Sequence, residues 1–310
     1  MSNEYAKYLA KHRADFIKLT DKQNRELARL YIQAVAEIKE RAELIINKKG
    51  LTYAAAKIRI KSLLIEASRL SDGFKGILDK SLIDSANLGK EVNALIMKSY
   101  QTSLASEGVK LNLTRILSKV SSNAIKAVYN RIWTDGLKLS DRIWLLDRRT
   151  KQEIERIVMQ NIISGGAASD KVTLSALENL FQVNPKYKPA KLTSLHGRKV
   201  GYESSRLLRT SMSEAFNEGD RLSNIANPGV SGETWLAGPG ACDDCLDKDG
   251  QDCEDVGYPP GDSHPSCRCS TLAKVMSAEA FTSSWLEFMD NPDKYPQYQD
   301  WLLNVYKKAA

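Results

Sequence analysis

Apolar side chains recur every three or four residues through most of residues 1–120, and Lys, Arg and Glu fill the positions between them. This period predicts amphipathic α-helices. One helix precedes Thr52, a second runs from Thr52 to an interruption at Asp72-Gly73, and a third runs from Leu78 to Leu104. The candidate core positions of these helices are Leu27, Leu30, Ala34, Ile38, Ala42, Ile45, Ile58, Leu63, Ile65, Leu70, Leu82, Ala86, Val92, Leu95, Ile96 and Tyr100. Because no proline precedes Pro185, nothing forces a sharp break, and the pattern predicts an elongated helical bundle or hairpin.

The same period continues through the middle of the chain. It predicts helices at 118–133, from Ser140 or Asp141 to Gly165-Gly166, at 174–181 and at 201–221. The candidate inner side of the last helix is formed by Leu208, Met212, Ala215 and Phe216. Residues 184–198 contain two prolines and predict a connecting loop.

The pattern changes near residue 227. Residues 233–237 have the character of a strand, and glycine, proline and acidic residues dominate 238–263. Beyond Lys274 two short helices are predicted, and their large apolar residues are candidates for a core or a docking face. These residues are Trp285, Phe288, Trp301, Leu302 and Tyr306.

Charge is distributed unevenly along the chain. Residues 1–210 carry 38 Lys/Arg and 21 Asp/Glu, a net charge of +17, whereas residues 211–310 carry 7 and 17, a net charge of −10. A basic part joined to an acidic end indicates two partners of different character. Double-stranded DNA suits the basic part, because phosphate contacts need Lys and Arg on a surface. The alternative is a well-solvated helical surface that is rich in Lys.

The composition excludes several classes of protein. With 310 residues, 42% apolar and 27% charged, the chain is not a collagen, a low-complexity protein or a wholly disordered one. Its length suits two domains. No apolar run approaches the ~18–20 residues of a membrane span, and the charged first residues lack the apolar core of a signal peptide. We therefore expect no membrane association and a protein made in a reducing cytoplasm.

All five cysteines lie between positions 242 and 269. One Cys-x-x-Cys pair is followed, after twenty-one intervening residues, by a Cys-x-Cys pair, with a histidine just before it. Two thiolates from one tight turn and a second pair from a distant loop can complete the tetrahedron of a structural zinc ion. Such an ion supplies folding energy to an acidic loop with little core of its own. The candidate ligands are Cys242, Cys245, His264, Cys267 and Cys269.

Zinc takes four ligands, so these five candidates leave a choice. The four thiols are the first choice, and His264 either replaces one thiol of the second pair or orients it from outside the coordination shell. Cys253 is the expected spectator. Disulfides and unligated thiols are the alternatives, and a reducing compartment disfavours disulfides. A site closed by four protein ligands has no position for water, so we expect it to be structural.

The segment His264-Pro265-Ser266-Cys267-Arg268-Cys269, preceded by Cys242-x-x-Cys245 and Pro259-Pro260, resembles the end of the MuF-type head-morphogenesis domain. This domain belongs to the minor head (minor capsid) proteins of tailed bacteriophages. Residues 209–217 resemble the Arg-Thr-rich helix of that family, and residues 234–237 resemble the strand before the first cysteine pair. The resemblance covers about residues 120–275. Residues 238–241 depart from it, because the family often has an acidic and Arg-Thr element there.

Together these features predict an α+β, predominantly α protein. An elongated N-terminal helical region, residues 1–120, is followed by a mixed MuF-like domain at residues 121–275. That domain contains a small zinc-stapled, strand-containing Cys/His module at residues 234–272. Residues 276–310 form a helical tail.

The resemblance implies a non-enzymatic structural component of the virion, present in the interior of the phage head and, during assembly, in the host cytoplasm. Proteins of this family associate with the portal protein and with capsid or scaffolding proteins. They enter the procapsid before DNA packaging and are linked to the fate of the DNA at ejection. Double-stranded DNA, bound non-specifically by the basic helical region, is the further expected partner.

No catalytic motif stands out in the sequence. The His-x-Glu of a zinc deaminase, the His-Glu-x-x-His of a metalloprotease, the Gly-x-Ser-x-Gly elbow and the Walker phosphate loop are all absent. His196 is expected to be a loop residue. The alternative function is a zinc-containing nucleic-acid-binding enzyme such as a nuclease, for which His264 is the only candidate base.

Overall fold

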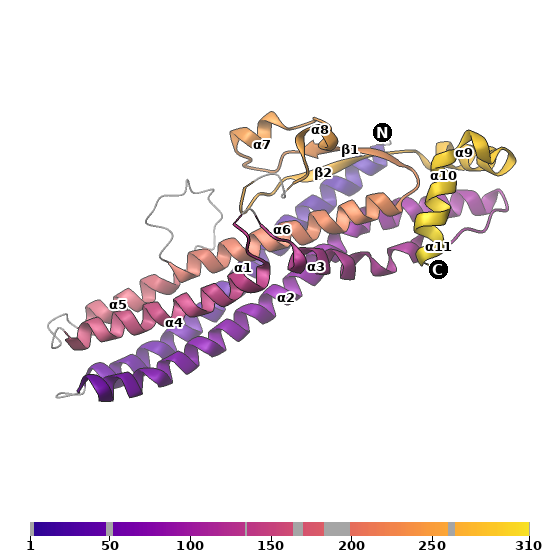
Figure 1. Cartoon of the computed structure of the whole chain (residues 1–310). Helices are drawn as coiled ribbons and strands as arrows, with labels where there is room; N and C mark the ends of the chain where they lie inside the picture. Colours follow the sequence, from indigo (N-terminus) through magenta and orange to yellow (C-terminus); the bar gives the residue numbers. More distant parts are fainter. Residues whose placement is uncertain are drawn as a thin grey trace. The chain divides into compact units, whose positions relative to one another are not determined.

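The computed structural model describes residues 3–47, 52–133, 135–163, 170–182, 199–259 and 264–309. The helices are α1 (Asn3–Ile46), α2 (Tyr53–Ser106), α3 (Val120–Asn130), α4 (Leu139–Ile163), α5 (Asp170–Phe181), α6 (Val200–Ala226), α7 (Asp243–Asp247), α8 (Cys253–Val256), α9 (Ala278–Asp290), α10 (Pro296–Trp301) and α11 (Lys307–Ala309) (Figure 1). Shorter helical segments are η1 (Thr114–Lys119), η3 (Pro292–Lys294) and the π-helix η4 (Leu302–Tyr306). Two strands, β1 (Val230–Leu236) and β2 (Ser270–Val275), form an antiparallel sheet. The predicted class, predominantly α with a small β component, is confirmed.

Three of the predicted features lie outside the described residues. They are the loop at 184–198, which includes His196, the Gly165-Gly166 stop, and Pro260. In the part of the chain that the structure describes, no helix combines the length and the apolar character needed to cross a bilayer.

The chain folds as two compact units, each assembled from separate stretches of sequence. The sheet unit contains Met1–Leu19, Leu82–Val128 and Thr210–Ala310, and the helical unit contains Thr20–Ser81 and Tyr129–Arg209. By residue count the sheet unit has a net charge of −5 and the helical unit a net charge of +12. The predicted boundaries at residues 120 and 275 follow the order of the chain, and they stay a prediction.

The expected interruption at Asp72-Gly73 is wrong, because α2 passes through both residues as one continuous helix. Gly73 instead allows α1 and α2 to approach closely within the helical unit. A Cβ atom added at Gly73 would lie 2.9 Å from Cδ1 of Leu30. The missing side chain therefore makes room for Leu30, and the glycine does not end the helix.

The predicted core face of the long helices is correct for most positions but not for all. In α2, Ile58 is 68% exposed and Ile65 is 56% exposed, while Ile60 and Phe74 are buried. Leu95 is also exposed. In α1 the buried positions include Tyr31 and Val35, which take the places expected for Leu30 and Ala34. The prediction of helices was correct, but the buried face of α1 and α2 lies at positions next to those that were predicted.

An aromatic cluster forms much of the core of the sheet unit. Tyr100 of α2 stacks on Phe281 of α9 with ring centres 4.2 Å apart, and Trp285 lies against Phe281. The Trp301 indole donates a hydrogen bond to the Ala226 carbonyl oxygen at 3.0 Å. Trp285, Phe288 and Trp301 are buried, so their predicted role as core residues is confirmed; Leu302 and Tyr306 pack partly buried against them.

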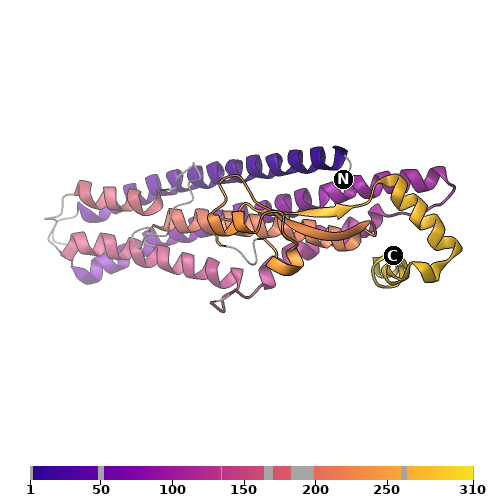
Figure 2. The same ribbon diagram turned by 90° about the horizontal axis from the view of Figure 1, so that it is seen from above.

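The sheet is formed by strands that are far apart in sequence. Trp235 pairs with Thr271 and Leu236 pairs with Ser270. The helices α7 and α8 lie in the connection between β1 and β2, and both strands run beside α6 (Figures 1 and 2). The strand at 233–237 was predicted, but β2 was not.

Within the sheet unit, α2 and α6 cross with their backbones in contact. A Cβ atom added at Gly89 of α2 would overlap the carbonyl oxygen of Phe216, and one added at Gly219 of α6 would lie 2.5 Å from the carbonyl oxygen of Ala86. Each helix therefore contacts the other through a glycine. This close crossing fixes the position of α6, against which the sheet packs.

Candidate metal centre

The first cysteine pair lies at the start of α7. Cys242 is the N-cap residue, and its carbonyl oxygen accepts bonds from the N–H groups of Cys245 at 3.0 Å and Leu246 at 2.9 Å. This single helical turn places the two thiols of the pair on one side. The Cys-x-x-Cys spacing thus has the local geometry that two ligands of one ion require.

The second pair lies in the segment that leads into β2. The N–H of Cys267 donates to the carbonyl oxygen of His264 at 3.2 Å, and Ser266 within this turn has a left-handed backbone with φ of 63°. The N–H of Cys269 donates to the sulfur of Cys267 at 3.4 Å. These contacts turn His264 and Cys267 toward the first pair before the chain extends into the strand.

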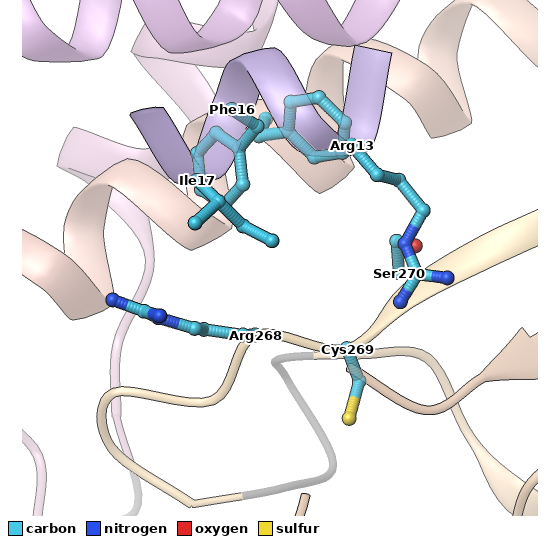
Figure 3. A pocket seen from close by; sticks show the side chains of 7 residues that line it. Arg13, Phe16, Ile17, Arg268, Cys269 and Ser270 are labelled. Carbon is cyan, nitrogen blue, oxygen red and sulfur yellow. The ribbon is translucent and has the colours of Figure 1, made fainter. Parts of the chain in front are cut away.

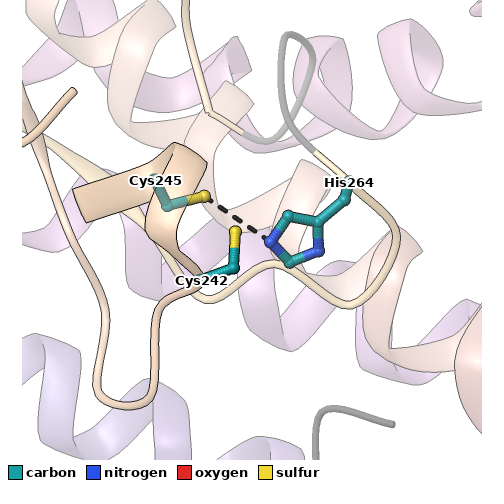
Figure 4. A group of neighbouring side chains, drawn as sticks. All are labelled: Cys242, Cys245 and His264. Carbon is teal, nitrogen blue, oxygen red and sulfur yellow. Dashed lines mark hydrogen bonds between the residues drawn. The ribbon is translucent and has the colours of Figure 1, made fainter. Parts of the chain in front are cut away.

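The five predicted ligands meet in two groups that share one sulfur. The side-chain donor atoms of Cys242, Cys245 and His264 all lie within 4.8 Å of one another, and so do those of Cys245, Cys267 and Cys269. Figure 4 shows the first group, with the Cys245 sulfur directed at the imidazole. Cys245 therefore belongs to both groups, and the Cys/His cluster can hold a metal ion.

Two separations in this cluster match those of a tetrahedral ion, although the candidates gather in groups of three and not of four. A zinc–thiolate bond of about 2.3 Å places two tetrahedral sulfur ligands about 3.8 Å apart. The sulfurs of Cys245 and Cys267 are 3.9 Å apart, and the Cys245 sulfur is 3.5 Å from Nε2 of His264. The two distant pairs thus converge, as the sequence spacing predicted. Which four of the five side chains bind stays a prediction.

The orientation of the His264 ring favours a direct role for this residue. Its Nδ1 lies 3.0 Å from the carbonyl oxygen of Pro265, to which it can donate. With the proton on Nδ1, the Nε2 lone pair is free and faces the sulfur of Cys245. Such a backbone hydrogen bond is the usual way in which a ligating histidine is held.

The thiols of the cluster have unequal proton affinities. Burial raises the pKa of Cys245, and the neighbouring charge of Cys269 adds to this effect. The pKa of Cys269 is lowered, first by a hydrogen bond from Cys267 and also by the Gly238 N–H, which lies 3.4 Å from its sulfur. A cation that binds here therefore displaces protons from the other thiols, and its affinity depends on pH.

Cys253 lies outside both ligand groups. It is fully buried in an apolar cluster with Trp235 and the cysteines. Burial raises its pKa to about 12, and the nearby Glu233 carboxylate acts in the same direction. Cys253 is therefore a neutral buried thiol, in keeping with the spectator role predicted for it.

Trp235 is a structural residue of the site that sequence reasoning did not single out. Its side chain is completely buried beneath the cluster, and the ammonium of Lys248 lies 4.7 Å from the ring centre. Its backbone N–H and C=O pair with Gln251 and Gly250, both at 2.8 Å. One residue thus fixes the acidic loop to β1 and supplies the apolar floor of the cluster.

Two residues of α6 fasten the second cysteine pair. The Thr210 hydroxyl accepts a bond from the Ser266 N–H at 2.8 Å, and the Asn217 amide donates to the Cys269 carbonyl oxygen at 3.1 Å. Both residues belong to the Arg-Thr-rich segment noted in the sequence. Their role is to dock the segment that carries the second cysteine pair on the helix.

A small cavity separates this segment from α1. It is lined by Arg13, Phe16, Ile17, Phe216, Arg268, Cys269 and Ser270 (Figure 3). The Arg13 guanidinium donates to the Ala237 carbonyl oxygen at 2.8 Å, and burial lowers its pKa. In Figure 3 the sulfur of Cys269 points away from the side chains of α1. Cys269 therefore lines the cavity while its thiol is directed away from α1.

Sequence reasoning also missed a buried pair of carboxylates between α6 and the sheet. The Thr271 hydroxyl lies 2.6 Å from Oδ2 of Asp220 and 3.3 Å from Oε1 of Glu233, and the Asn224 amide bonds to both carboxylates. Burial raises the pKa of Asp220 to about 7, and burial also raises the pKa of Glu233. No sequence signal links these two residues, because they lie on different elements.

No family model, curated protein or solved structure matches the chain.

Proposed function

We propose that this protein is a minor head (minor capsid) protein of a tailed phage, a structural and assembly component of the virion with no enzymatic activity. One observation carries the proposal. The separate segments that resemble the MuF-type domain, in α6, in β1 and in the two cysteine pairs, meet at one place in the sheet unit. Because these segments form one folded site, they support the resemblance to the MuF-type domain more strongly than each segment does alone.

We further propose that the cluster holds a zinc ion with a structural role. The donor set of thiols and an imidazole suits zinc. Cys245, Cys267 and Cys269 are buried, and five candidate ligands are enough to fill four positions. The structure gathers these candidates in groups of three, and a fourth ligand drawn from the other group would close the site to water, as a structural ion requires.

The charges of the two units support two kinds of partner. The helical unit, with its net charge of +12, suits the phosphates of double-stranded DNA packaged in the head. The sheet unit, with its net charge of −5, suits protein contacts with the portal and with capsid or scaffolding proteins. In this proposal the protein joins the procapsid in the host cytoplasm and remains inside the phage head.

Co-purification with the portal protein of the same phage tests the assembly role. The two proteins are co-expressed, with the tag on the portal, and this chain is expected to be retained in a fixed ratio. Cys245→Ser, which removes the sulfur common to both ligand groups, is expected to lose retention, whereas Cys253→Ser keeps it. Absence of the wild-type chain from the portal fraction and from purified virions would contradict the proposal.

A nuclease assay separates the structural role from the enzymatic alternative. Wild type and His264→Ala are incubated with duplex and single-stranded DNA, with zinc or magnesium. We expect no cleavage by either protein. Metal-dependent cleavage that disappears in His264→Ala would favour the nuclease.

Binding of duplex DNA tests the role of the basic unit. The logarithm of the binding constant is expected to fall with the logarithm of salt concentration, with a slope of about −0.9 for each phosphate neutralised. A binding constant that does not change with salt would remove this part of the proposal.

A further inference from the structure

The connection between α3 and α4 carries two tryptophans among cationic side chains. The ring of Trp133 lies between two guanidinium groups, those of Arg131 and Arg142, whose central carbons are 5.5 Å and 4.7 Å from the ring centre. In the first turns of α4, the guanidinium of Arg148 lies 5.4 Å from the ring centre of Trp144. Trp144 is 57% exposed. A large flat ring is thus presented to solvent beside a cation.

Hydrogen bonds join several described residues of this connection. The Trp133 N–H donates to the Leu137 carbonyl oxygen at 3.1 Å, and the Gly136 N–H donates to the Trp133 carbonyl oxygen at 2.8 Å. Arg142 forms two bonds to the Asp135 carboxylate, at 2.7 Å and 2.8 Å. These bonds hold Trp133 and Gly136 in place, and Arg142 at the start of α4, two residues before Trp144.

Helix α2 brings a further cation to the same place. Its Ser71 hydroxyl donates to Asp147 of α4 at 2.5 Å, and its Asp79 accepts a bond from Tyr129 just before the connection. Lys75 is one helical turn from each of these contacts and shares their face of α2. Its side chain is exposed. Lys75 therefore lies beside the α3–α4 connection.

Three of the acidic groups near this surface have partners. Asp135 is bonded to Arg142, Asp147 to Lys151 at 2.7 Å and to Ser71, and Asp79 to Tyr129. Within the described part of the chain, by contrast, no carboxylate lies at ion-pair distance from Lys75, Lys138 or Arg148. The surface thus combines an exposed aromatic ring with cations that form no ion pair within the described part of the chain.

We propose that this tryptophan surface (Lys75, Lys138, Trp144 and Arg148) binds single-stranded DNA. An unpaired base can stack on the ring of Trp144, and the three cations can contact the adjacent phosphates. An acidic peptide would satisfy the charges but would leave the aromatic face without a flat partner. A duplex would satisfy the charges too, but its bases are stacked and not available. The proposal deepens the DNA contact proposed above, and it rests on that contact for the choice of DNA as the polyanion.

Fluorescence anisotropy on the full-length protein tests this assignment. The probes are a labelled oligo(dT) of about 20 nucleotides and a duplex of the same length, since single-strand sites span about 4–16 nucleotides. Trp144→Ala is expected to weaken oligo(dT) binding about ten-fold, the scale of one lost base–aromatic stack, and to leave duplex binding unchanged. Trp144→Phe keeps an aromatic face and is expected to retain most of the affinity. Arg148→Glu is expected to weaken binding of both probes.

Two variants serve as matched controls. Ile58→Ala removes another exposed apolar side chain of the helical unit, on α2. Arg156→Glu reverses a charge further along α4, where Arg156 is paired with Glu153 at 2.9 Å. Ile58→Ala is expected to leave both affinities unchanged, and Arg156→Glu to weaken oligo(dT) binding less than Arg148→Glu does. Circular dichroism of each variant checks that the fold is retained.

The outcomes separate this inference from the proposed function. If salt-dependent duplex binding is present but Trp144→Ala binds oligo(dT) as wild type does, the tryptophan surface is not a single-strand site and only this inference fails. If polyglutamate displaces oligo(dT) at equal charge concentration, the surface is a protein-docking site and the inference is again overturned. If wild type binds neither probe, the proposed DNA contact fails together with it.

Discussion

The amide of Asn217 on α6 donates a hydrogen bond to the carbonyl oxygen of Cys269, 3.1 Å away, at the point where the metal-binding segment enters β2. The same amide also donates to the Ser213 carbonyl oxygen within α6, at 2.8 Å. Asn217 is buried. This side chain therefore connects the helix directly to the last cysteine of the cluster.

Replacement of Asn217 by Ala is expected to lower the free energy of unfolding by about 1–3 kcal/mol, because the Cys269 carbonyl oxygen loses its buried donor. Urea unfolding of the metal-loaded protein measures the effect. Asn304→Ala is the matched control, since Asn304 makes an exposed bond to Asp300. An equal decrease in the free energy of unfolding for both variants would contradict a stabilising role for the Asn217 contact.

Removal of the sulfur shared by the two ligand groups is expected to abolish metal binding. Cys245→Ser should purify without zinc under anaerobic conditions, whereas Cys253→Ser should retain one zinc per chain, because Cys253 belongs to neither group. Elemental analysis by mass spectrometry measures both. Structural zinc contributes about 10–16 kcal/mol in small zinc-binding peptides, so the metal-free variant is also expected to lose its strands. Zinc in equal amounts in both variants would rule out the cluster as the binding site.

The buried pair Asp220 and Glu233 predicts a pH dependence of stability. The folded protein keeps the Asp220 proton up to a pKa of about 7, and the unfolded chain releases it near its ordinary value of 3.8. Between these two values the folded state holds more protons, so stability falls as pH rises from about 4 to about 7 and then stays level. A shift of this size corresponds to an effect on the order of 4 kcal/mol.

Replacement of Asp220 by Asn mimics the protonated acid and is expected to remove this slope. Urea unfolding at about pH 5 and about pH 8 should show that Asp220→Asn gains more stability over wild type at the higher pH than at the lower one. A variant that follows wild type at both values would contradict the assignment.

The crossing of α2 and α6 predicts opposite effects for two glycines of α2. Gly89→Ala places a methyl group against the Phe216 carbonyl oxygen and is expected to cost about 1–3 kcal/mol or more. Gly76→Ala meets nothing within 4 Å and is expected to stabilise the helix by about 0.4–1 kcal/mol. Thermal unfolding compares the two variants. A Gly89→Ala protein as stable as wild type would mean that the helices are further apart than described.

The sequence predicted the helices well, because an apolar period persists over many turns. It could not assign every face, and Ile58 and Ile65 show why. An isoleucine at helical spacing fits the core pattern equally well on two adjacent faces, and only the packing of a neighbouring helix decides between them. Gly73 shows a related limit, since a glycine that ends a helix and one that admits a neighbouring side chain look the same in sequence.

The candidate site was predictable where its chemistry imposes a spacing. The thiols of Cys242 and Cys245 fill only two of the four positions around a zinc ion. The sequence therefore predicted that the second cysteine pair would lie close to the first. The supporting residues carry no such constraint. Asn217 and Trp235 act through a backbone carbonyl and through burial, and nothing in the local sequence distinguishes these roles from ordinary helix and strand positions.

The strands of the sheet are separated by a long stretch of chain, from the end of β1 at Leu236 to the start of β2 at Ser270. Closing a loop of this length costs conformational entropy before any strand pair forms. Two short strands contribute little stabilisation to offset that cost. If the Cys/His cluster holds the proposed zinc ion, completion of the sheet depends on the zinc available to the newly synthesised chain. Cells grown with a chelator would then yield chains whose helices form while their strands stay unpaired, and proteases would remove those chains first.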